Sequence, residues 1–324
     1  MSLYNKYRPK NFNQLMHGKF TKVFEENFSH HAYLFFGPPG CGKTSAARLC
    51  MANLNNKIDS NSFVDGTHPD YYEINCAVNN GVDEIRDIIS GTVNTLPVQC
   101  THKFIVFDEA HMLTTQAQNA LLKTTEEPPS HVKFIFCTTE VNKVIPAIRS
   151  RCQLVPFNKL SKLDLISIIE RICISEEIKF SKESLELIAN CSDGSGRAAI
   201  NLLEQTNLLL NDPSATAAAL GTLDSTSFNN LTYLFCNKKT NECIKLLDEI
   251  FEKTNDHGSI MNQYADFIAE CIVTRLTAPS ECPFDGKQLM VLAECLTNIL
   301  KDFKILQNIK LISKLHFLKG ISKL

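Results

Sequence analysis

A glycine-rich stretch at residues 37–44, GPPGCGKT, contains the residue types that bind phosphate groups. It follows an apolar run, precedes a helical pattern and matches the spacing G-x-x-x-x-G-K-[ST]. Its glycines allow backbone N–H groups to turn toward phosphate oxygens, and the following helix adds its positive N-terminal end. We expect Lys43 to reach the β- and γ-phosphates and the Thr44 hydroxyl to ligate Mg²⁺; the alternative is a glycine-rich turn without a ligand. The candidate nucleotide-binding residues of this stretch are Gly37, Pro38, Pro39, Gly40, Cys41, Gly42, Lys43, Thr44 and Ser45.

An acidic pair, Asp108 and Glu109, follows the apolar run FIVF at residues 104–107. The run predicts a buried strand, and open α/β sheets bind ligands at the carboxyl ends of their strands. Asp108 is placed to help hold Mg²⁺, and Glu109 to orient or deprotonate an attacking water. The other interpretation is an acidic pair that caps the next helix. Together with the phosphate loop, the pair favours an ATPase over a protein that only binds nucleotide.

A second strand end with polar residues is FCTTE, at residues 136–140. A hydroxyl group at this point would lie beside the γ-phosphate and hold the water. We prefer Thr139 to Thr138 for this role, and ordinary turn chemistry accounts for the pattern equally well.

Two arginines, Arg149 and Arg151, stand close together in NKVIPAIRSRCQLVPF at residues 142–157. Apolar residues flank the pair, and the last part of the stretch has the composition of a buried strand. One interpretation is a salt bridge at the start of that strand. The other is an arginine that serves a site outside its own domain, since a guanidinium fork suits phosphate oxygens.

Short apolar runs alternate with helical patterns in the first half of the chain. The runs that predict strands lie at residues 32–37, 71–76, 103–109, 133–139 and 153–157. Apolar strands separated by helices predict a parallel sheet that is covered on both faces. After Asn158 the periodicity is helical, with a break at residues 211–214. The expected fold is an α/β domain, a small helical domain and a larger all-helical domain.

The overall composition is that of a globular protein. The chain has 324 residues, 44% of them apolar and 21% charged, and a net charge of −2. This charge gives no global signature of nucleic-acid binding, although a local basic patch is sufficient for it. The 13 cysteines are scattered without a CxxC pair, which indicates a reducing compartment. Without a signal peptide or a long apolar run, we expect a cytoplasmic protein of a bacterium or a phage-infected cell, with no membrane contact.

The motifs occur in an order that resembles a known family. KYRP, the phosphate loop, NNGVDEIRD, DEAHML, NALLKTTEEPP, CTTE and SRC follow one another as in the gamma/tau subunit of the bacterial DNA polymerase III clamp loader, an AAA+ ATPase. The chain is also similar to replication factor C subunits and to the large subunits of phage clamp loaders. The resemblance is dense over residues 4–157 and continues through 194–205. It implies an AAA+ ATP-binding domain at residues 1–158, a helical lid at 159–212 and a helical collar at 222–324.

The resemblance also implies roles for individual residues outside the phosphate loop. Arg151, in SRC, would reach the ATP site of the neighbouring subunit, and Arg197, in GSGRAAI, would contact the phosphates of its own subunit. Tyr7, Arg8 and Pro9 would pack on the adenine. Arg149 has no such match and is expected to be a surface or DNA-facing charge, and a surface arginine at a helix start is the alternative for Arg197.

The stretch CAVNNGVDEIRDII, at residues 76–89, is the longest close match to the family. In the family this region lies near the primer–template, so Asn79, Asn80 and Arg86 are candidate contacts to DNA phosphates. Such contacts position a protein without reading sequence. The alternative for Arg86 is an i,i+3 charge pair with Asp83 on a helix.

The chain departs from the bacterial family in two places. Bacterial gamma/tau chains usually carry four zinc-binding cysteines after the phosphate-loop helix, but here no cysteine occurs between Cys50 and Cys76. We therefore expect no structural zinc. The long tail of the bacterial tau form is also missing, which favours a minimal loader from a phage or a divergent replicon.

The leading hypothesis is the ATP-hydrolysing motor subunit of a sliding-clamp loader, with ATP and Mg²⁺ as cofactors. Its expected partners are further loader subunits, in a pentamer of several copies plus an accessory subunit, together with the sliding clamp and primer–template DNA. Another AAA+ DNA-remodelling motor of the branch-migration type is one alternative. A non-hydrolysing structural loader subunit is the other, although the intact Lys43, Thr44, Asp108 and Glu109 argue against it.

Overall fold

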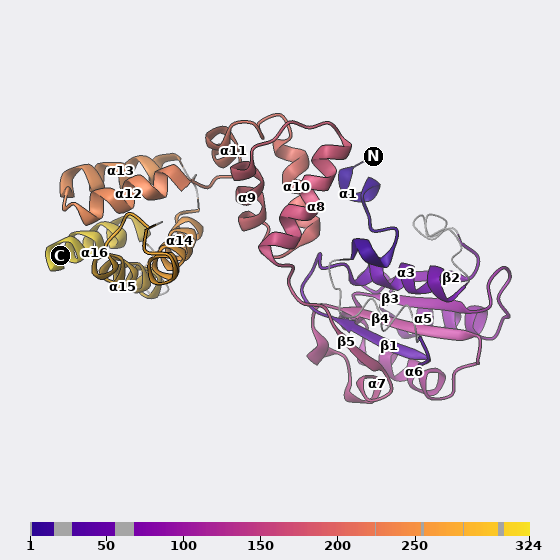
Figure 1. Cartoon of the computed structure of the whole chain (residues 1–324). Coiled ribbons are helices and arrows are strands. Elements are labelled where there is room, and N and C mark those ends of the chain that lie inside the picture. The colour runs from indigo at the N-terminus through magenta and orange to yellow at the C-terminus, as the bar shows by residue number, and fades with distance from the viewer. Residues whose placement is uncertain are drawn as a thin grey trace. The chain divides into compact units, whose positions relative to one another are not determined.

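The computed structural model describes residues 2–15, 28–55, 68–223, 225–253, 256–280, 282–303 and 308–324. Figure 1 shows an α/β part at the N-terminal side of the chain and helices in the rest. The strands are β1 (Ala32–Phe36), β2 (Tyr71–Asn75), β3 (Lys103–Asp108), β4 (Val132–Thr138) and β5 (Gln153–Pro156). The helical elements up to β5 are α1 (Leu3–Lys6), η1 (Phe12–Gln14), α3 (Lys43–Leu54), α5 (Val82–Ile88), η2 (Ile89–Val93), η3 (Ala110–Met112), α6 (Thr115–Glu126), η4 (Val141–Lys143) and α7 (Pro146–Arg149).

The five strands form one parallel sheet in the order β2-β3-β4-β1-β5. Each begins and ends within one residue of the range predicted from the sequence, so the predicted α/β class is confirmed. Because β4 lies between β1 and β3, the residues that follow these three strands meet at one edge of the sheet. That edge is where ligands bind in open α/β folds.

Apolar side chains cover both faces of the sheet, as continuous apolar strands require. Alternate residues of β1 point to opposite faces, so Tyr33 and Phe35 pack with α3. Leu34 packs on the other face with Ile85 of α5 and Leu121 of α6. Figure 1 shows α3 on one side of the sheet and α6 and α7 on the other. The sheet is therefore a rigid support for the loops at its carboxyl edge.

Local signals explain where α6 begins and ends. Thr114 is the N-cap, and its side chain accepts a hydrogen bond from the N–H of Ala117. The helix ends at Glu126, just before Glu127 and two prolines that cannot continue it.

The remaining helical elements follow β5. They are α8 (Lys162–Ser175), α9 (Lys182–Cys191), α10 (Gly196–Thr206), α11 (Pro213–Ala219), α12 (Ser225–Cys236), α13 (Thr240–Lys253), α14 (His257–Thr277), α15 (Gly286–Phe303) and α16 (Ile309–Lys323). The chain forms two compact units, the first made of residues 1–175 and 192–205 and the second of 176–191 and 206–324. The helices α8 and α10 thus belong with the sheet, whereas α9 belongs with the later helices. The division into three domains stays a prediction.

The second unit has its own apolar core, built from α12 to α16. Phe235 packs edge-on against Phe317 at 5.5 Å between ring centroids, and Tyr264 stacks on Phe228 at 5.2 Å. The Tyr264 hydroxyl is buried and shares a 3.0 Å hydrogen bond with the hydroxyl of Thr232. Among the described helices, none combines the length and the apolar character that a membrane span requires.

Candidate nucleotide-binding site

The phosphate loop joins β1 to α3 and depends on glycine at three positions. Gly37, Gly40 and Gly42 have φ angles of 150°, 72° and 96°, which other residues rarely adopt. A Cβ on Gly37 would lie 1.9 Å from the carbonyl oxygen of Phe157, and one on Gly40 would lie 2.0 Å from Oγ of Ser195. The loop is thus enclosed by the chain after β5 and by the residues just before α10.

Lys43 is the first residue of α3 and only 7% exposed. Its Nζ donates hydrogen bonds to the carbonyl oxygens of Gly37, at 2.9 Å, and Pro38, at 2.8 Å. The cation is therefore held over the phosphate loop itself. Burial lowers the pKa of Lys43, opposed by the nearby Cys137 and Glu109. A phosphate anion in the loop would offset this lowering, because a nearby opposite charge favours the protonated lysine.

Thr44 and Asp108 bring a hydroxyl and a carboxylate together from different elements. Thr44 Oγ1 donates to Asp108, and it lies 3.2 Å from each carboxylate oxygen. Burial raises the pKa of Asp108, and the neighbouring carboxylates of Glu73 and Glu109 raise it further. A hard divalent cation prefers oxygen ligands, and its charge would stabilise the ionised carboxylate. These two residues therefore fit Mg²⁺.

Glu73, one of the carboxylates that raise the pKa of Asp108, is held in place by an ion pair with Arg48. Arg48 of α3 donates to both of its carboxylate oxygens at 2.8 Å, and the Tyr71 hydroxyl donates to one of them at 2.8 Å. The Arg48 and Glu73 side chains are 11% and 21% exposed. A bidentate pair in this environment fixes the position of Glu73 on β2, which pairs with the strand that ends in Asp108.

Glu109 follows β3 in a left-handed conformation, with φ of 53°. Its Oε2 is buried and, within the described part of the chain, has no hydrogen-bond partner. The Nδ1 atom of His111 lies 3.4 Å from that oxygen. Since non-glycine residues seldom adopt this backbone conformation, the strain is consistent with a functional position for the carboxylate.

Thr138 is the last residue of β4, and Thr139 follows it, between the phosphate loop and Asp108. Thr138 is fully buried, and its hydroxyl lies 3.2 Å from Nδ1 of His111 and accepts the N–H of Glu140 at 3.0 Å. Its carbonyl accepts the N–H of Gly37 at 3.2 Å. Thr139, directly after the strand, is half-buried. The role predicted for Thr139 stays a prediction.

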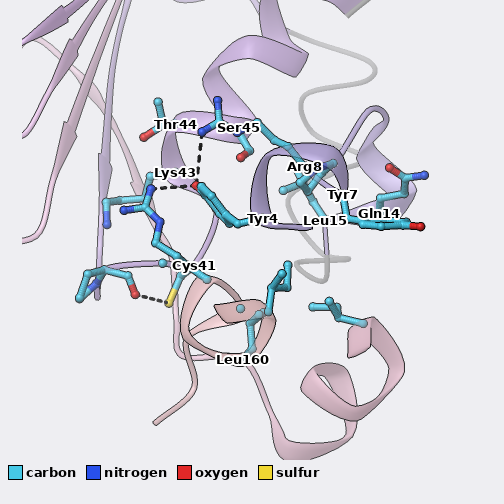
Figure 2. A pocket seen from close by; sticks show the side chains of 18 of the residues that line it. Tyr4, Tyr7, Arg8, Gln14, Leu15, Cys41, Lys43, Thr44, Ser45 and Leu160 are labelled. Atoms are coloured by element: carbon cyan, nitrogen blue, oxygen red, sulfur yellow. Dashed lines mark hydrogen bonds between the residues drawn. The ribbon is translucent and has the colours of Figure 1, made fainter. Parts of the chain in front are cut away.

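One pocket of the first unit brings most of the predicted residues together (Figure 2). Residues 39–45 line it, and so do Asp108, Glu109 and Arg197. The proposed adenine-packing residues, at positions 7–9, line it as well. Cys41 is buried, and its thiol lies 3.7 Å from the carbonyl of Gly194, so it packs against the segment that leads into α10.

Several pocket residues were missed by the sequence analysis. They are Tyr4, Gln14, Leu15, Leu160, Ile168, Arg171, Gly196 and Ile200. Tyr4 had a usable signal, because it lies one helical turn before the predicted residues Tyr7 and Arg8. The apolar members come from segments far apart in the sequence, and their spacing alone gives no sign that they share a pocket.

The two arginines before β5 lie outside this pocket's lining. Arg151 donates to the carbonyl of Ala147 and to Glu126 Oε2, both at 2.9 Å. The ion pair with Glu126 is partly exposed, which makes its contribution to stability small. Arg149 Nε is buried without a hydrogen-bond partner among the described residues. A salt bridge at this strand's start is therefore present, and the proposed action of Arg151 on a neighbouring subunit stays a prediction.

The candidate DNA-binding residues lie in α5 and in the segment before it. Arg86 and Asp83 form the expected i,i+3 pair at 3.4 Å, with side chains 67% and 89% exposed. Asn79 and Asn80 are half-buried, and the carbonyl of Asn80 accepts the N–H of Thr114. An exposed arginine in a weak pair can still bind phosphate, so both interpretations of Arg86 remain.

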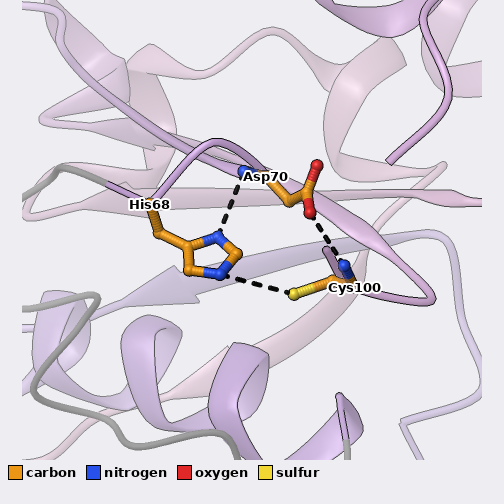
Figure 3. A group of neighbouring side chains, drawn as sticks. All are labelled: His68, Asp70 and Cys100. Atoms are coloured by element: carbon orange, nitrogen blue, oxygen red, sulfur yellow. Dashed lines mark hydrogen bonds between the residues drawn. The ribbon is translucent and has the colours of Figure 1, made fainter. Parts of the chain in front are cut away.

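A separate cluster of His68, Asp70 and Cys100 holds the loop that precedes β3 (Figure 3). The Asp70 carboxylate accepts three backbone N–H groups at 2.6–2.8 Å, from Val98, Gln99 and Cys100. His68 Nδ1 accepts the N–H of Asp70, and its Nε2 lies 3.7 Å from the Cys100 thiol. These hydrogen bonds explain the cluster as a loop anchor, although its ligand types would also suit a metal.

The expectation of no structural zinc concerned the interval between Cys50 and Cys76. Residues 56–67 of that interval lie outside the described residues. The expectation therefore stays a prediction.

The sheet order, the loop between β1 and α3 and the acidic end of β3 define a P-loop α/β fold, followed by helices. A family model described as "DNA polymerase III, delta subunit" matches residues 13–161. The chain is 33% identical over 298 residues to the DNA polymerase III subunit tau of Bacillus subtilis, covering 86% of this chain and 52% of that protein. It is 38% identical over 218 residues to the DNA polymerase III subunit gamma of Buchnera aphidicola from Schizaphis graminum, covering 62% of this chain and 60% of that protein.

These matches confirm the resemblance to clamp-loader subunits of the gamma/tau type, and the chain spans 52% and 60% of these two relatives. Among solved structures, a point mutant of Thermotoga maritima RuvB aligns with a TM-score of 0.53 over 71% of this chain and 79% of that chain. Its sequence identity is 18%, so this likeness is one of fold alone.

Proposed function

We propose that this chain is an ATP-hydrolysing motor subunit of a sliding-clamp loader, which opens the clamp and places it on primer–template DNA. The observation that carries the ATPase part is the meeting of Lys43, Thr44 and Asp108 at one edge of the sheet, with Glu109 beside them. The similarity to DNA polymerase III gamma and tau subunits supports the clamp-loading part.

The reaction would be transfer of the γ-phosphoryl group of ATP to water. Bound Mg²⁺ would neutralise charge on the β- and γ-phosphates. Lys43 would bind the same phosphates, and Thr44 and Asp108 would hold the ion. Glu109 would orient or deprotonate the water, with the Thr139 hydroxyl as a second hydrogen-bond partner. Tyr7, Arg8 and Pro9 would pack against the adenine.

The assembly would contain several copies of this chain, with an accessory subunit and in total five members. Arg151 would leave its weak pair with Glu126 and reach the ATP site of a neighbouring copy, where an arginine finger is worth about 10³–10⁵ in rate. Asn79, Asn80 and Arg86 would meet DNA phosphates. The sliding clamp would bind to the α/β domain.

Two other functions are weaker. A branch-migration motor has support only from the fold likeness to RuvB, at 18% identity. The other alternative is a structural loader subunit that does not hydrolyse ATP, and the description of the matching family model, a delta subunit, is compatible with it. Such a subunit would have no need for a complete set of Lys43, Thr44, Asp108 and Glu109, and this chain has all four.

The test is steady-state ATP hydrolysis by the purified chain with the sliding clamp and accessory subunit of its own replicon. Wild type, Arg151→Ala and the control Arg275→Ala, which lies in α14, are compared with and without primer–template DNA. We expect clamp and DNA together to stimulate wild type and the control. Arg151→Ala should lose about 10³-fold or more in rate while it still binds ATP.

Mixing two inactive variants tests whether Arg151 acts between subunits. Lys43→Ala supplies the arginine and Arg151→Ala supplies an intact phosphate loop, so a mixture should recover hydrolysis. Activity that ignores the clamp would favour the remodelling motor, and no hydrolysis in any mixture would favour the structural subunit.

A further inference from the structure

Tyr4 of α1 connects two arginines at the nucleotide pocket. Its hydroxyl accepts hydrogen bonds from Nη2 of Arg197, at 2.8 Å, and from Nη2 of Arg8, at 3.4 Å. Both guanidinium groups also lie near its ring, at 4.7 Å for Arg197 and 5.4 Å for Arg8. In Figure 2 the hydroxyl of Tyr4 is the meeting point of two dashed lines. A neutral phenol is thus the shared acceptor of two cations.

Neither arginine has an ion-pair partner within 4.0 Å among the residues that the structure describes. Arg8 Nε is buried and has no hydrogen-bond partner there. Arg8 and Arg197 line the same pocket as the phosphate loop, together with Arg171. The charge of Arg8 also acts on the nearby Glu73 carboxylate, whereas that of Arg197 is available to an anion in this pocket. A phosphate oxygen is a better acceptor for a guanidinium than a phenol is.

The same contact ties α1 to α10. Next to the pair of Tyr4 and Arg197, the backbone N–H of Leu3 donates to Oε1 of Glu204 at 3.4 Å. Both contacts lie within the first compact unit. If the Arg197 side chain moved from the phenol to a phosphate, the 2.8 Å hydrogen bond between Tyr4 and Arg197 would break. Of these two hydrogen bonds, only the 3.4 Å one between Leu3 and Glu204 would then connect α1 to α10, so nucleotide binding would weaken the packing of α1 on α10.

We propose that Tyr4 is a positioning residue that competes with the γ-phosphate of a nucleoside triphosphate for Arg197. This inference rests on the proposed function, because it requires that the pocket binds ATP. A triphosphate takes the guanidinium and releases Tyr4, whereas a diphosphate leaves the pair in place. The helix α1 then changes its attachment with the nucleotide state.

The ionisation of Tyr4 offers a readout of this exchange. Burial alone would raise the pKa of Tyr4, but the hydrogen bonds and charges of Arg197 and Arg8 outweigh it and the pKa lies below its ordinary value. Loss of Arg197 from the phenol raises the pKa again. By linkage, triphosphate affinity must then fall as pH rises through the pKa of Tyr4 in the free protein.

The chain suits this measurement because it has no tryptophan and 7 tyrosines. Tyrosinate absorbance is titrated with pH for wild type, Tyr4→Phe and the control Tyr233→Phe, which replaces an exposed residue of α12. Each is measured alone, with saturating ATPγS and with saturating ADP. We expect the lowest titration step to be present in wild type and control, absent in Tyr4→Phe, and moved upward by ATPγS but not by ADP.

Nucleotide affinity provides the second readout. Tyr4→Phe removes the competing acceptor, so ATPγS should bind about fivefold more tightly, the equivalent of one hydrogen bond of about 1 kcal/mol. The ADP affinity should not change. Weaker ATPγS binding by Tyr4→Phe, or a wild-type titration that ATPγS does not move although it binds, would overturn this inference and leave the proposed function intact. Failure to bind either nucleotide would overturn both.

Discussion

At the scale of single residues, the site is built from groups whose surroundings disfavour their charged forms. Lys43 is desolvated over the phosphate loop, and Asp108 lies close to two further carboxylates. The pKa of the buried lysine is lowered and that of the buried aspartate is raised for the same reason. In each case burial disfavours the charged form more than the neighbouring groups stabilise it. Magnesium and a polyphosphate would supply the missing charges, which makes ligand binding and stability interdependent.

We predict that Asp108→Asn stabilises the protein without added metal and weakens Mg²⁺ binding. The raised pKa means that the ionised carboxylate destabilises the fold at pH values above that pKa, and that this cost disappears as the pH falls through it. The variant should therefore have a higher thermal midpoint at neutral pH, and about 10–100-fold lower Mg²⁺ affinity. Thermal unfolding and magnesium titration with ADP present measure the two effects.

The matched control for this variant is Asp83→Asn, which removes an exposed carboxylate of α5. It should leave both quantities unchanged. A lower thermal midpoint for Asp108→Asn at neutral pH would show that the protein without metal stabilises the ionised carboxylate of Asp108. That result would contradict the account of this site.

At the scale of elements, the phosphate loop and the segment after β5 approach each other closely at the carboxyl edge of the sheet. The N–H of Phe157 donates to the carbonyl of Phe36 at 2.7 Å, and the N–H of Gly37 donates to that of Thr138 at 3.2 Å. These bonds continue the sheet beyond β1, β4 and β5 and set the direction in which the loop leaves β1. Only glycine fits at position 37, because of its φ angle and because of the adjacent carbonyl of Phe157.

Gly37→Ala should lower the free energy of unfolding of the first unit by about 2–4 kcal/mol, from backbone strain and steric overlap together. The control is Gly91→Ala in η2, where an added Cβ meets nothing within 4 Å. Because alanine is the better helix former, the control should be neutral or slightly stabilising. Urea unfolding of both variants provides the comparison, and equal midpoints for the two would contradict the predicted role of Gly37.

Much of this element-scale architecture follows from local sequence. The strands are short apolar runs whose ends are marked by polar or glycine residues, and the phosphate loop has a fixed spacing, so both could be predicted. The i,i+3 pair of Asp83 and Arg86 was predictable for the same reason. In contrast, Tyr4 and Arg197 are 193 positions apart, and their contact depends on how α10 packs near the loop. No local pattern encodes such a contact.

Arg151 and Lys103 show two further limits of sequence reasoning. The sequence around Arg151 is compatible both with a salt bridge and with a role in a neighbouring subunit. The structure of a single subunit can show only the salt bridge, which Arg151 forms with Glu126. Lys103 is 1% exposed within β3, where its Nζ donates to three oxygen atoms of Thr92 and Thr95. Its burial could not be predicted, because a lysine at a strand's start is usually solvated.

At the scale of the whole molecule, the chain combines a unit that contains the candidate nucleotide pocket with a second unit that has an independent apolar core. The helices α8 and α10 belong to the unit with this pocket, and the segment that leads into α10 lies against the phosphate loop at Gly40 and Cys41. A nucleotide in the pocket would therefore touch both the sheet and this helical pair.

The central claim, that this pocket binds and hydrolyses ATP, is tested most directly by separating binding from turnover. We would measure ATP binding and phosphate release for wild type, Lys43→Ala and Glu109→Gln in the assembled loader. The account predicts that Lys43→Ala loses both, whereas Glu109→Gln binds ATP as wild type does and loses about 10²–10⁴ in turnover, the usual contribution of a general base. Undiminished phosphate release by Glu109→Gln, or normal ATP binding by Lys43→Ala, would contradict it.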